Sequence, residues 1–201
     1  MAAAVEVVVV VAAEAVADDC LLKIKIMALL CITYPKFAEA DFNRIQAFRS
    51  ENDALYFSKV NPHITLVFPV PEMDETEFIR EVNLRAAGFE AFEVNFTAAV
   101  FNRDAFLEVW HVFLVPDEGN GNLIRLHDRL YEGILFPHRK MEIDFMPHIG
   151  IGNSKDKMAC KKMADEWNRQ EFSIRGRVNA LELVKYDGQM VHPISTLHLS
   201  R

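Results

Sequence analysis

The sequence predicts an α+β protein with two pseudo-symmetric lobes, each a mostly antiparallel sheet with helices packed outside, around a central cleft. One observation is that short apolar, β-rich runs alternate with amphipathic stretches along the 201 residues. The other is a duplicated element, Pro62-His63-Ile64-Thr65-Leu66 and Pro147-His148-Ile149-Gly150-Ile151. In both copies the strand with this element leads into a helix and then into another strand, which indicates two related halves.

The first half of the chain contains its expected elements in a clear order. A β-rich stretch that ends at Pro35 predicts the first strand. Apolar residues at Phe42, Ile45 and Phe48 predict an amphipathic helix, and acidic residues from Asp74 onward open another. The expected order is a strand at 23–32, a helix at 37–52, a strand at 56–70, a helix at 74–87, and strands at 92–101 and 105–115 joined by a turn at 102–104.

The second half follows a similar plan. An apolar stripe of Leu123, Leu126, Leu130 and Ile134 predicts a helix after the glycine-containing loop at 119–121. The expected order is this helix, the strand with the second Pro-His element, a helix at 155–170, a strand at 172–186, a turn at Asp187-Gly188 and a closing strand at 191–200. We expect the two halves to form one domain, because no long linker separates them.

Composition limits the function classes. With 51% hydrophobic and 25% charged residues the chain is globular rather than disordered. A net charge of −7 argues against a protein that coats nucleic acid, but it allows a small phosphate ligand or an RNA end. Cys20, Cys31 and Cys160 are odd in number and widely spaced, which favours reduced thiols in a cytoplasmic protein.

The beginning of the chain has its own composition. Residues 1–22 form an Ala/Val-rich extension of uncertain order, and residues 23–201 form the two-lobed domain. Acidic residues interrupt the extension and no Lys or Arg precedes its apolar run, so it lacks the pattern of a signal peptide. It is also too short and too acidic for a transmembrane helix. We therefore expect a protein without a membrane partner, most simply a monomer.

The duplicated element places one imidazole in each half. Because side chains alternate along a strand, His63 and Thr65 share one face while Ile64 and Leu66 point toward a core. The same alternation puts His148 and Gly150 together. A single strand histidine is usually an ordinary structural residue, but two in matched settings are candidates for a general acid and a general base.

The other histidines receive structural interpretations. His127 is expected to pack against or cap its helix, and His111 could face the cleft from the strand that contains Trp110. Loop or edge positions are expected for His138, His192 and His198. No pair of these histidines has a spacing that demands zinc.

These motifs resemble those of the two-histidine (2H) phosphoesterase superfamily, which includes 2′-5′ RNA ligase-like proteins and cyclic phosphodiesterases. The signature of that superfamily is a pair of His-x-Thr/Ser-x motifs with hydrophobic residues at x. His63-Ile64-Thr65-Leu66 matches it closely, and His148-Ile149-Gly150-Ile151 matches it except at the hydroxyl position. The end of the chain, residues 183–188 followed by Leu197-His198-Leu199, is also similar to the closing hairpin of that family.

The resemblance implies a metal-independent phosphodiesterase without a cofactor. Its substrate would be a cyclic phosphate or a 2′,5′-phosphodiester of a nucleotide or RNA end. His63 and His148 would act as general base and general acid, in an order that the sequence leaves open, because an unperturbed imidazole titrates near 6.5. The Thr65 hydroxyl would hold a phosphoryl oxygen.

Gly150 departs from the family pattern because it has no hydroxyl. A backbone N–H at Gly150, an ordered water or the hydroxyl of Ser154 could compensate, and Lys155 could attract the phosphate. The alternative is a nucleotide or RNA-end binding protein that has lost turnover. A third interpretation, a protein-interaction scaffold that uses neither histidine, ranks lowest.

Overall fold

A computed structural model describes residues 27–104, 107–141 and 144–200, and the expected extension at 1–22 lies outside these ranges. Within them the chain forms two antiparallel sheets with helices outside, as the sequence predicts. The elements are β1 (Ala28–Thr33), β2 (Lys36–Phe37), α1 (Glu39–Asn52), β3 (Ile64–Pro71), α2 (Glu75–Ala86), β4 (Phe92–Arg103), β5 (Trp110–Glu118), α3 (Asn120–Leu130), a 3₁₀ helix η1 (Gly133–His138), β6 (Ile149–Ser154), α4 (Lys157–Asn168), β7 (Ile174–Val178), β8 (Ala180–Tyr186) and β9 (Val191–His198).

Each Pro-His element leads into a strand of a different sheet. One sheet has the order β3-β1-β8-β9 and the other has the order β2-β7-β4-β5-β6, in the part of the chain that is described. The first element enters β3 and the second enters β6, and in both halves this strand is followed by a helix and then a strand. The duplication predicted from the sequence is therefore present in the order of elements.

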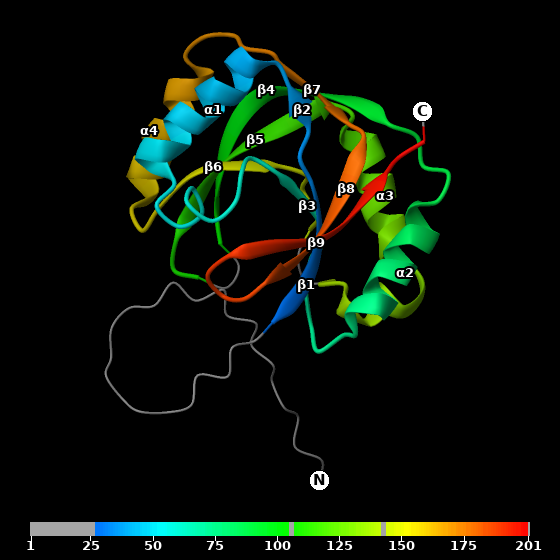
Figure 1. Cartoon of the computed structure of the whole chain (residues 1–201). Helices are drawn as coiled ribbons and strands as arrows, with labels where there is room; N and C mark the ends of the chain where they lie inside the picture. Colours follow the sequence, from blue (N-terminus) through cyan, green and yellow to red (C-terminus); the bar gives the residue numbers. More distant parts are fainter. Residues whose placement is uncertain (1–26, 105–106, 142–143, 201) are drawn as a thin grey trace, which may run out of the picture.

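The helices cross between the halves. Helix α1 precedes β3 in the chain but packs against β6 of the other sheet, and α3 precedes β6 but packs against β3. Figure 1 shows α1 and α4 side by side, with α2 and α3 together on the opposite side of the molecule. Gly152 of β6 permits the close approach of α1, because a Cβ there would lie 3.3 Å from the Asn52 carbonyl oxygen.

Several expected elements have different bounds. The strand expected at 105–115 is β5, which runs from Trp110 to Glu118. The predicted strand at 172–186 is two strands in different sheets, β7 and β8, with Asn179 between them. The predicted strand at 56–70 begins only at Ile64, because the preceding residues form a turn. In this turn the N–H groups of Tyr56 and Phe57 donate hydrogen bonds to Asp53. The apolar stripe of α3 ends at Leu130, since Gly133 adopts a positive φ of 66° and Ile134 belongs to η1.

The core is built from the inner faces of both sheets and the apolar stripes of the helices. Ile64 and Leu66 of β3 and Ile149 and Ile151 of β6 are all fully buried, as the alternation predicts. Cys31 and Cys160 are buried free thiols, whereas Cys20 lies outside the described residues. Among the described helices, none is both long enough and apolar enough to span a membrane.

Candidate active site

The two histidines occupy equivalent places, one residue before β3 and one residue before β6. The Nδ1 atom of His63 lies 2.9 Å from the carbonyl oxygen of Asn61, and that of His148 lies 2.6 Å from the carbonyl oxygen of Met146. In both cases a proline separates the histidine from the residue that supplies the carbonyl. The proline favours an extended conformation at that residue, so the same local sequence produces the same hydrogen bond twice.

These hydrogen bonds fix the tautomer of both rings. A carbonyl oxygen can only accept, so Nδ1 carries the hydrogen in each imidazole and Nε2 holds the lone pair. Each Nε2 is therefore ready to take a proton from a substrate or water. After it has done so, the same carbonyl continues to accept from Nδ1 and stabilises the charged ring.

Both imidazoles resist protonation. Burial lowers the pKa of His63 to about 4, against a raising contribution from the Asn61 carbonyl, and the charges of Arg49 and His148 lower it further. Burial also lowers the pKa of His148 to about 4, and His111 adds to the effect. Because His148 acts on the pKa of His63, the two rings lie within electrostatic reach of each other. An anion held between them would raise the pKa of both.

The hydroxyl position differs between the two motifs. Thr65 is half-buried, and its hydroxyl forms no hydrogen bond with the described residues. Gly150 is also half-buried, and a Cβ added there would have no atom within 4 Å. Open space therefore faces Gly150 where the first motif has a hydroxyl.

A β-bulge follows the second motif. Phe113 of β5 pairs with Gly150 while Val112 pairs with Gly152, so Ile151 is the extra residue between them. A bulge re-aims the residues that follow it. As a result Gly152 faces Met163 of α4, whereas Asn153 pairs with His111 and its side chain reaches Asp53.

Aromatic rings hold the two imidazoles in different ways. The ring of Phe113 lies over His148 with 3.8 Å between ring centroids, and His111 stacks on Phe113 at 5.6 Å. His63 has only an edge contact with Tyr34, at 6.2 Å. His111 is buried, and its Nε2 lies 2.9 Å from a carboxylate oxygen of Asp104. Phe113 thus separates His111 from His148, and the prediction that His111 faces the cleft stays a prediction.

The remaining predicted phosphate ligands lie at the end of β6. The Ser154 hydroxyl accepts a hydrogen bond from the backbone N–H of Asp156 and so belongs to the turn that begins α4. Ser154 pairs with Trp110 across the strands, and Lys155 is exposed. Their roles toward a phosphate stay predictions.

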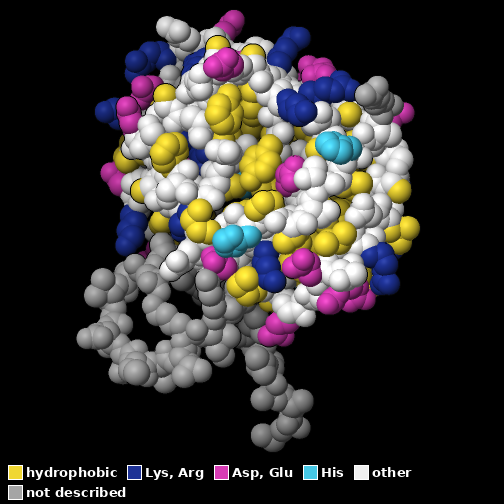
Figure 2. Space-filling model, viewed as in Figure 1, with side chains coloured by type: hydrophobic (Ala, Val, Ile, Leu, Met, Phe, Trp, Pro, Cys, Tyr) yellow, Lys and Arg dark blue, Asp and Glu magenta, His cyan; other side chains and the backbone are white. Residues whose placement is uncertain are grey.

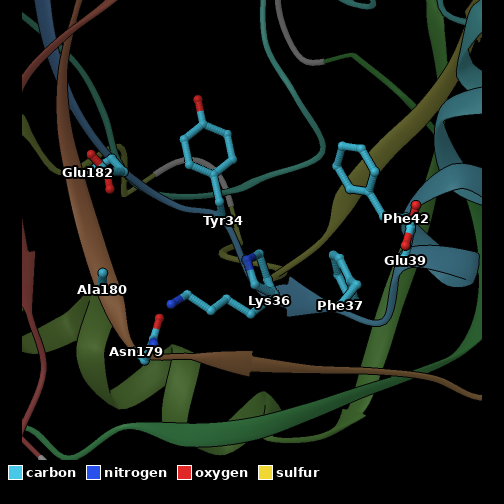
Figure 3. A pocket seen from close by; sticks show the side chains of 9 residues that line it. Tyr34, Lys36, Phe37, Glu39, Phe42, Asn179, Ala180 and Glu182 are labelled. Carbon is cyan, nitrogen blue, oxygen red and sulfur yellow. The ribbon is translucent and has the colours of Figure 1, made fainter.

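A pocket of about 510 Å³ lies next to Tyr34. Figure 3 shows Lys36 extending toward Asn179, with Phe37 and Phe42 together on the other side and Glu182 near Tyr34. Glu182 lies in the same row of paired residues as Thr65, because both pair with Ile32. Tyr34 connects this pocket to His63, because it lines the pocket and its ring lies 6.2 Å from that imidazole. The pocket also offers an ammonium, an amide and a carboxylate.

Comparison with known proteins identifies the family. The family model described as the 2′-5′ RNA ligase superfamily matches residues 36–190, most of the chain. The chain belongs to the 2′-5′ RNA ligase superfamily. The two-histidine resemblance inferred from the motifs is thereby confirmed.

A sequence relative and several solved structures are similar to this member of the superfamily. A Geobacillus sp. (strain WCH70) protein named "Putative phosphoesterase" is 32% identical over 114 residues, which are 54% of this chain and 62% of that protein. The chain thus spans less than two thirds of that relative's length. E. coli LigT complexed with ATP superposes with a TM-score of 0.56 at 14% identity, covering 88% of this chain and 99% of LigT.

Two further structures have the same fold. E. coli LigT complexed with 3′-AMP has a TM-score of 0.53 at 16% identity and covers 87% of this chain and 99% of LigT. Kluyveromyces marxianus Usb1 with uridine monophosphate has a TM-score of 0.51 at 11% identity, covering 87% of this chain and 99% of Usb1. At these identities the likeness establishes the fold, and the chemistry depends on the residues of this chain.

Sequence reasoning missed several residues that surround the motifs of this superfamily member. Phe113 covers His148, but nothing in the sequence distinguishes it from the other phenylalanines of the chain. Arg49 and Asp53 form an ion pair although both are almost fully buried. A signal for that pair existed, because Arg49 directly follows Phe48 on the apolar side of the predicted helix. In the described ranges, no three His, Cys, Asp or Glu side chains are grouped to hold a metal ion.

Proposed function

We propose that this protein cleaves a cyclic phosphate or a 2′,5′-phosphodiester of a nucleotide or RNA end, with His63 and His148 as the proton-transfer pair. The observation that carries the proposal is the mirrored setting of the two imidazoles. Each directly precedes a strand, each donates Nδ1–H to the carbonyl two residues earlier, and each keeps Nε2 for proton transfer. This arrangement supports one ring as base and the other as acid on opposite sides of one phosphate.

Hydrolysis of a 2′,3′-cyclic phosphate would proceed with balanced proton transfers. The neutral imidazole takes a proton from water as the water oxygen bonds to phosphorus. The bond from phosphorus to one ribose oxygen breaks, and the protonated imidazole gives its proton to that oxygen. The enzyme is left with the two protonation states exchanged, and exchange with solvent restores them. The Thr65 hydroxyl and the backbone N–H of Gly150 would donate to the phosphoryl oxygens, where charge develops.

The nucleoside would occupy the pocket beside Tyr34. The pocket volume of about 510 Å³ can hold a nucleoside, and Tyr34 both lines the pocket and contacts the His63 ring. Glu182 would accept hydrogen bonds from sugar hydroxyls or base amino groups, and Lys36 would contact a phosphate or a base oxygen. The relatives LigT and Usb1 were crystallised with 3′-AMP, ATP and uridine monophosphate, which supports a nucleotide as the ligand class.

A small ligand fits the surface charge better than a long nucleic acid does. Figure 2 shows hydrophobic side chains in the middle of one face, with Lys and Arg interspersed among Asp and Glu around them. A protein that binds a duplex or a long strand needs a continuous basic face. A mixed face with a net charge of −7 favours a nucleotide or the terminus of an RNA.

The test is turnover of a panel of 2′,3′-cyclic nucleotides and 2′,5′-linked dinucleotides. We expect His63→Ala and His148→Ala each to lower kcat by about 10²- to 10⁴-fold, the range for general acid–base groups. His192→Ala is the matched control, because His192 is an exposed imidazole of the β8–β9 hairpin. Wild-type turnover no faster than that of the double histidine variant across the panel would refute the proposed reaction.

A second candidate is a nucleotide-binding protein without turnover, and the missing hydroxyl at Gly150 favours it. This candidate predicts that 3′-AMP or a 2′,3′-cyclic nucleotide binds and is recovered unchanged. Calorimetry followed by chromatography of the ligand separates the candidates, because only the enzyme converts the cyclic compound to a monophosphate.

A further inference from the structure

The two motifs are connected through buried side chains of the segments that contain α1 and α3. Helix α1 leads into the first motif but packs on β6, the strand of the second motif. Helix α3 leads toward the second motif but packs on β3, the strand of the first. Each helix is therefore placed to fix one histidine relative to the other. The side chains that make these connections are an i, i+4 pair on each helix.

On α1 the pair is Arg49 and Asp53. Arg49 donates from Nη2 to the carbonyl of Val60, 2.9 Å away, in the segment that leads to His63. Its Nε donates to Oδ2 of Asp53 at 3.0 Å. The other oxygen of Asp53 accepts from the side-chain amide of Asn153 at 2.5 Å, on the strand that His148 begins. One ion pair thus ties the approach to the first histidine to the strand of the second.

On α3 the pair is His127 and Tyr131. The Nδ1 of His127 donates to the carbonyl of Leu66 at 2.8 Å, and the Tyr131 oxygen accepts from the backbone N–H of Phe68 at 2.8 Å, both on β3. The other side of the connection is a stack of His127 on Phe145, with centroids 3.6 Å apart and an interplanar angle of 5°. Phe145 lies three residues before His148. This pair ties the approach to the second histidine to the strand of the first.

Neither pair can bind substrate. Arg49 is 1% exposed, and its guanidinium donates to Asp53, Val60 and Gln46. His127 is 3% exposed and is covered by Phe145. Each of these contacts, taken alone, is an ordinary interaction of a protein core. Their distinguishing feature is that both join the same two motifs, in opposite directions.

We propose that the Arg49–Asp53 and His127–Tyr131 pairs are positioning residues that hold the His63 and His148 imidazoles at the separation and orientation needed for proton transfer. This inference rests on the proposed phosphodiesterase function. Misplacement of a reacting group by about 1 Å can cost up to about a hundredfold in rate, without any contact to substrate being lost.

The experiment removes one contact from each pair without burying a bare charge. Asn153→Ala deletes the amide that holds Asp53, and His127→Phe keeps a ring on Phe145 but deletes the N–H donated to Leu66. Asn168→Ala is the matched control, because Asn168 makes two comparable hydrogen bonds to the backbone of Ala99 on β4, a strand that carries neither motif. Thermal unfolding shows whether the three variants lose similar stability.

We expect Asn153→Ala and His127→Phe to lower kcat on a 2′,3′-cyclic nucleotide about tenfold, with KM changed less than about twofold. Asn168→Ala should leave kcat unchanged at an equal loss of Tm. Arg49→Lys should not retain full kcat, because an ammonium cannot donate to Asp53 and Val60 in the fork geometry of a guanidinium. Positioning variants with the kcat of Asn168→Ala would overturn the inference.

A readout without turnover separates this inference from the proposed function. Imidazole ¹⁵N spectra report the tautomer and pKa of His63, which faces Tyr34 just after β1, Arg49 of α1 and the His148 ring. In Asn153→Ala we expect the His63 pKa to rise as its approach segment loosens and water enters, whereas Asn168→Ala leaves it unchanged. If wild type shows no turnover, the proposed function fails, and an unmoved His63 spectrum in Asn153→Ala would then overturn the positioning role as well.

Discussion

Helices α1 and α3 hold the same place in the two halves, yet one uses a charged pair and the other a neutral pair. Arg49 and Asp53 form an ion pair with side chains 2% and 3% exposed, whereas His127 and Tyr131 work through neutral hydrogen bonds and a ring stack. The two halves therefore share a backbone plan and have diverged in how their side chains stabilise it. The duplication predicts where a connection must exist but not which chemistry makes it.

The same contrast holds at the motifs. The backbone gives both histidines an identical tautomer, but the first has Thr65 and a distant Tyr34, while the second has Gly150 and a closely stacked Phe113. The second motif has no hydroxyl at Gly150 but has the Phe113 ring, which restricts the His148 imidazole. Variants that exchange or remove these residues show which differences affect stability and which affect the rate.

The largest expected effect is on stability, at the charged pair. Arg49→Met leaves the Asp53 carboxylate buried without its cation, which costs about 3–5 kcal/mol. Tyr131→Phe leaves the Phe68 N–H without its acceptor and costs about 1–3 kcal/mol. Urea unfolding measures both. Arg49→Met/Asp53→Asn should be more stable than Arg49→Met, because asparagine keeps an oxygen for Tyr56 and carries no charge. If Arg49→Met and Arg49→Met/Asp53→Asn are equally stable, the buried Asp53 charge is not the source of the lost stability.

The next effect is the pH dependence of rate. The pKa of both His63 and His148 is lowered to about 4, so near pH 7 almost none of the free enzyme has the one protonated imidazole that must act as acid. As pH rises above these values, kcat/KM should fall tenfold per unit, or about a hundredfold from pH 5 to pH 7. The kcat profile should lie at higher pH, because bound phosphate raises both pKa values. A flat kcat/KM across this range would contradict the acid–base assignment.

The third effect tests the unequal hydroxyls. Thr65→Val should lower kcat/KM about tenfold, in line with about 1.5 kcal/mol for a hydrogen bond to a charged group. Gly150→Thr should raise it by a similar factor, because the space beside Gly150 is open and its φ is ordinary for a side chain. Gly150→Ala is the control for the added carbon alone. If Gly150→Thr and Gly150→Ala have the same kcat/KM, the backbone N–H of residue 150 already donates the hydrogen bond that a hydroxyl would supply.

Much of this arrangement could be predicted from the sequence, and there are physical reasons why the rest could not. The Pro-His elements predicted both strands, their buried faces and the matched settings of the two imidazoles, because alternation and proline act locally. The break at Asn179 also has a signal in the sequence, since the alternating buried residues change from even positions (Ile174, Val178) to odd ones (Leu181, Leu183) before Val184 is also buried. The crossing of the helices could not be read, because it depends on long-range packing. Nothing local shows that Asp53 meets a residue 100 positions away.

The smallest effect compares the rings beside the two imidazoles. Phe113→Leu removes a ring centred 3.8 Å from His148, whereas Tyr34→Leu removes an edge contact to His63 at 6.2 Å. Aromatic pairs contribute about 0.5–1.5 kcal/mol beyond their buried area, so Phe113→Leu should lower kcat about fivefold and Tyr34→Leu by less than about twofold. Tyr34 also lines the pocket, so its loss should appear mainly in KM. A larger kcat loss for Tyr34→Leu would mean that the first imidazole, rather than the second, depends on its neighbouring ring for orientation.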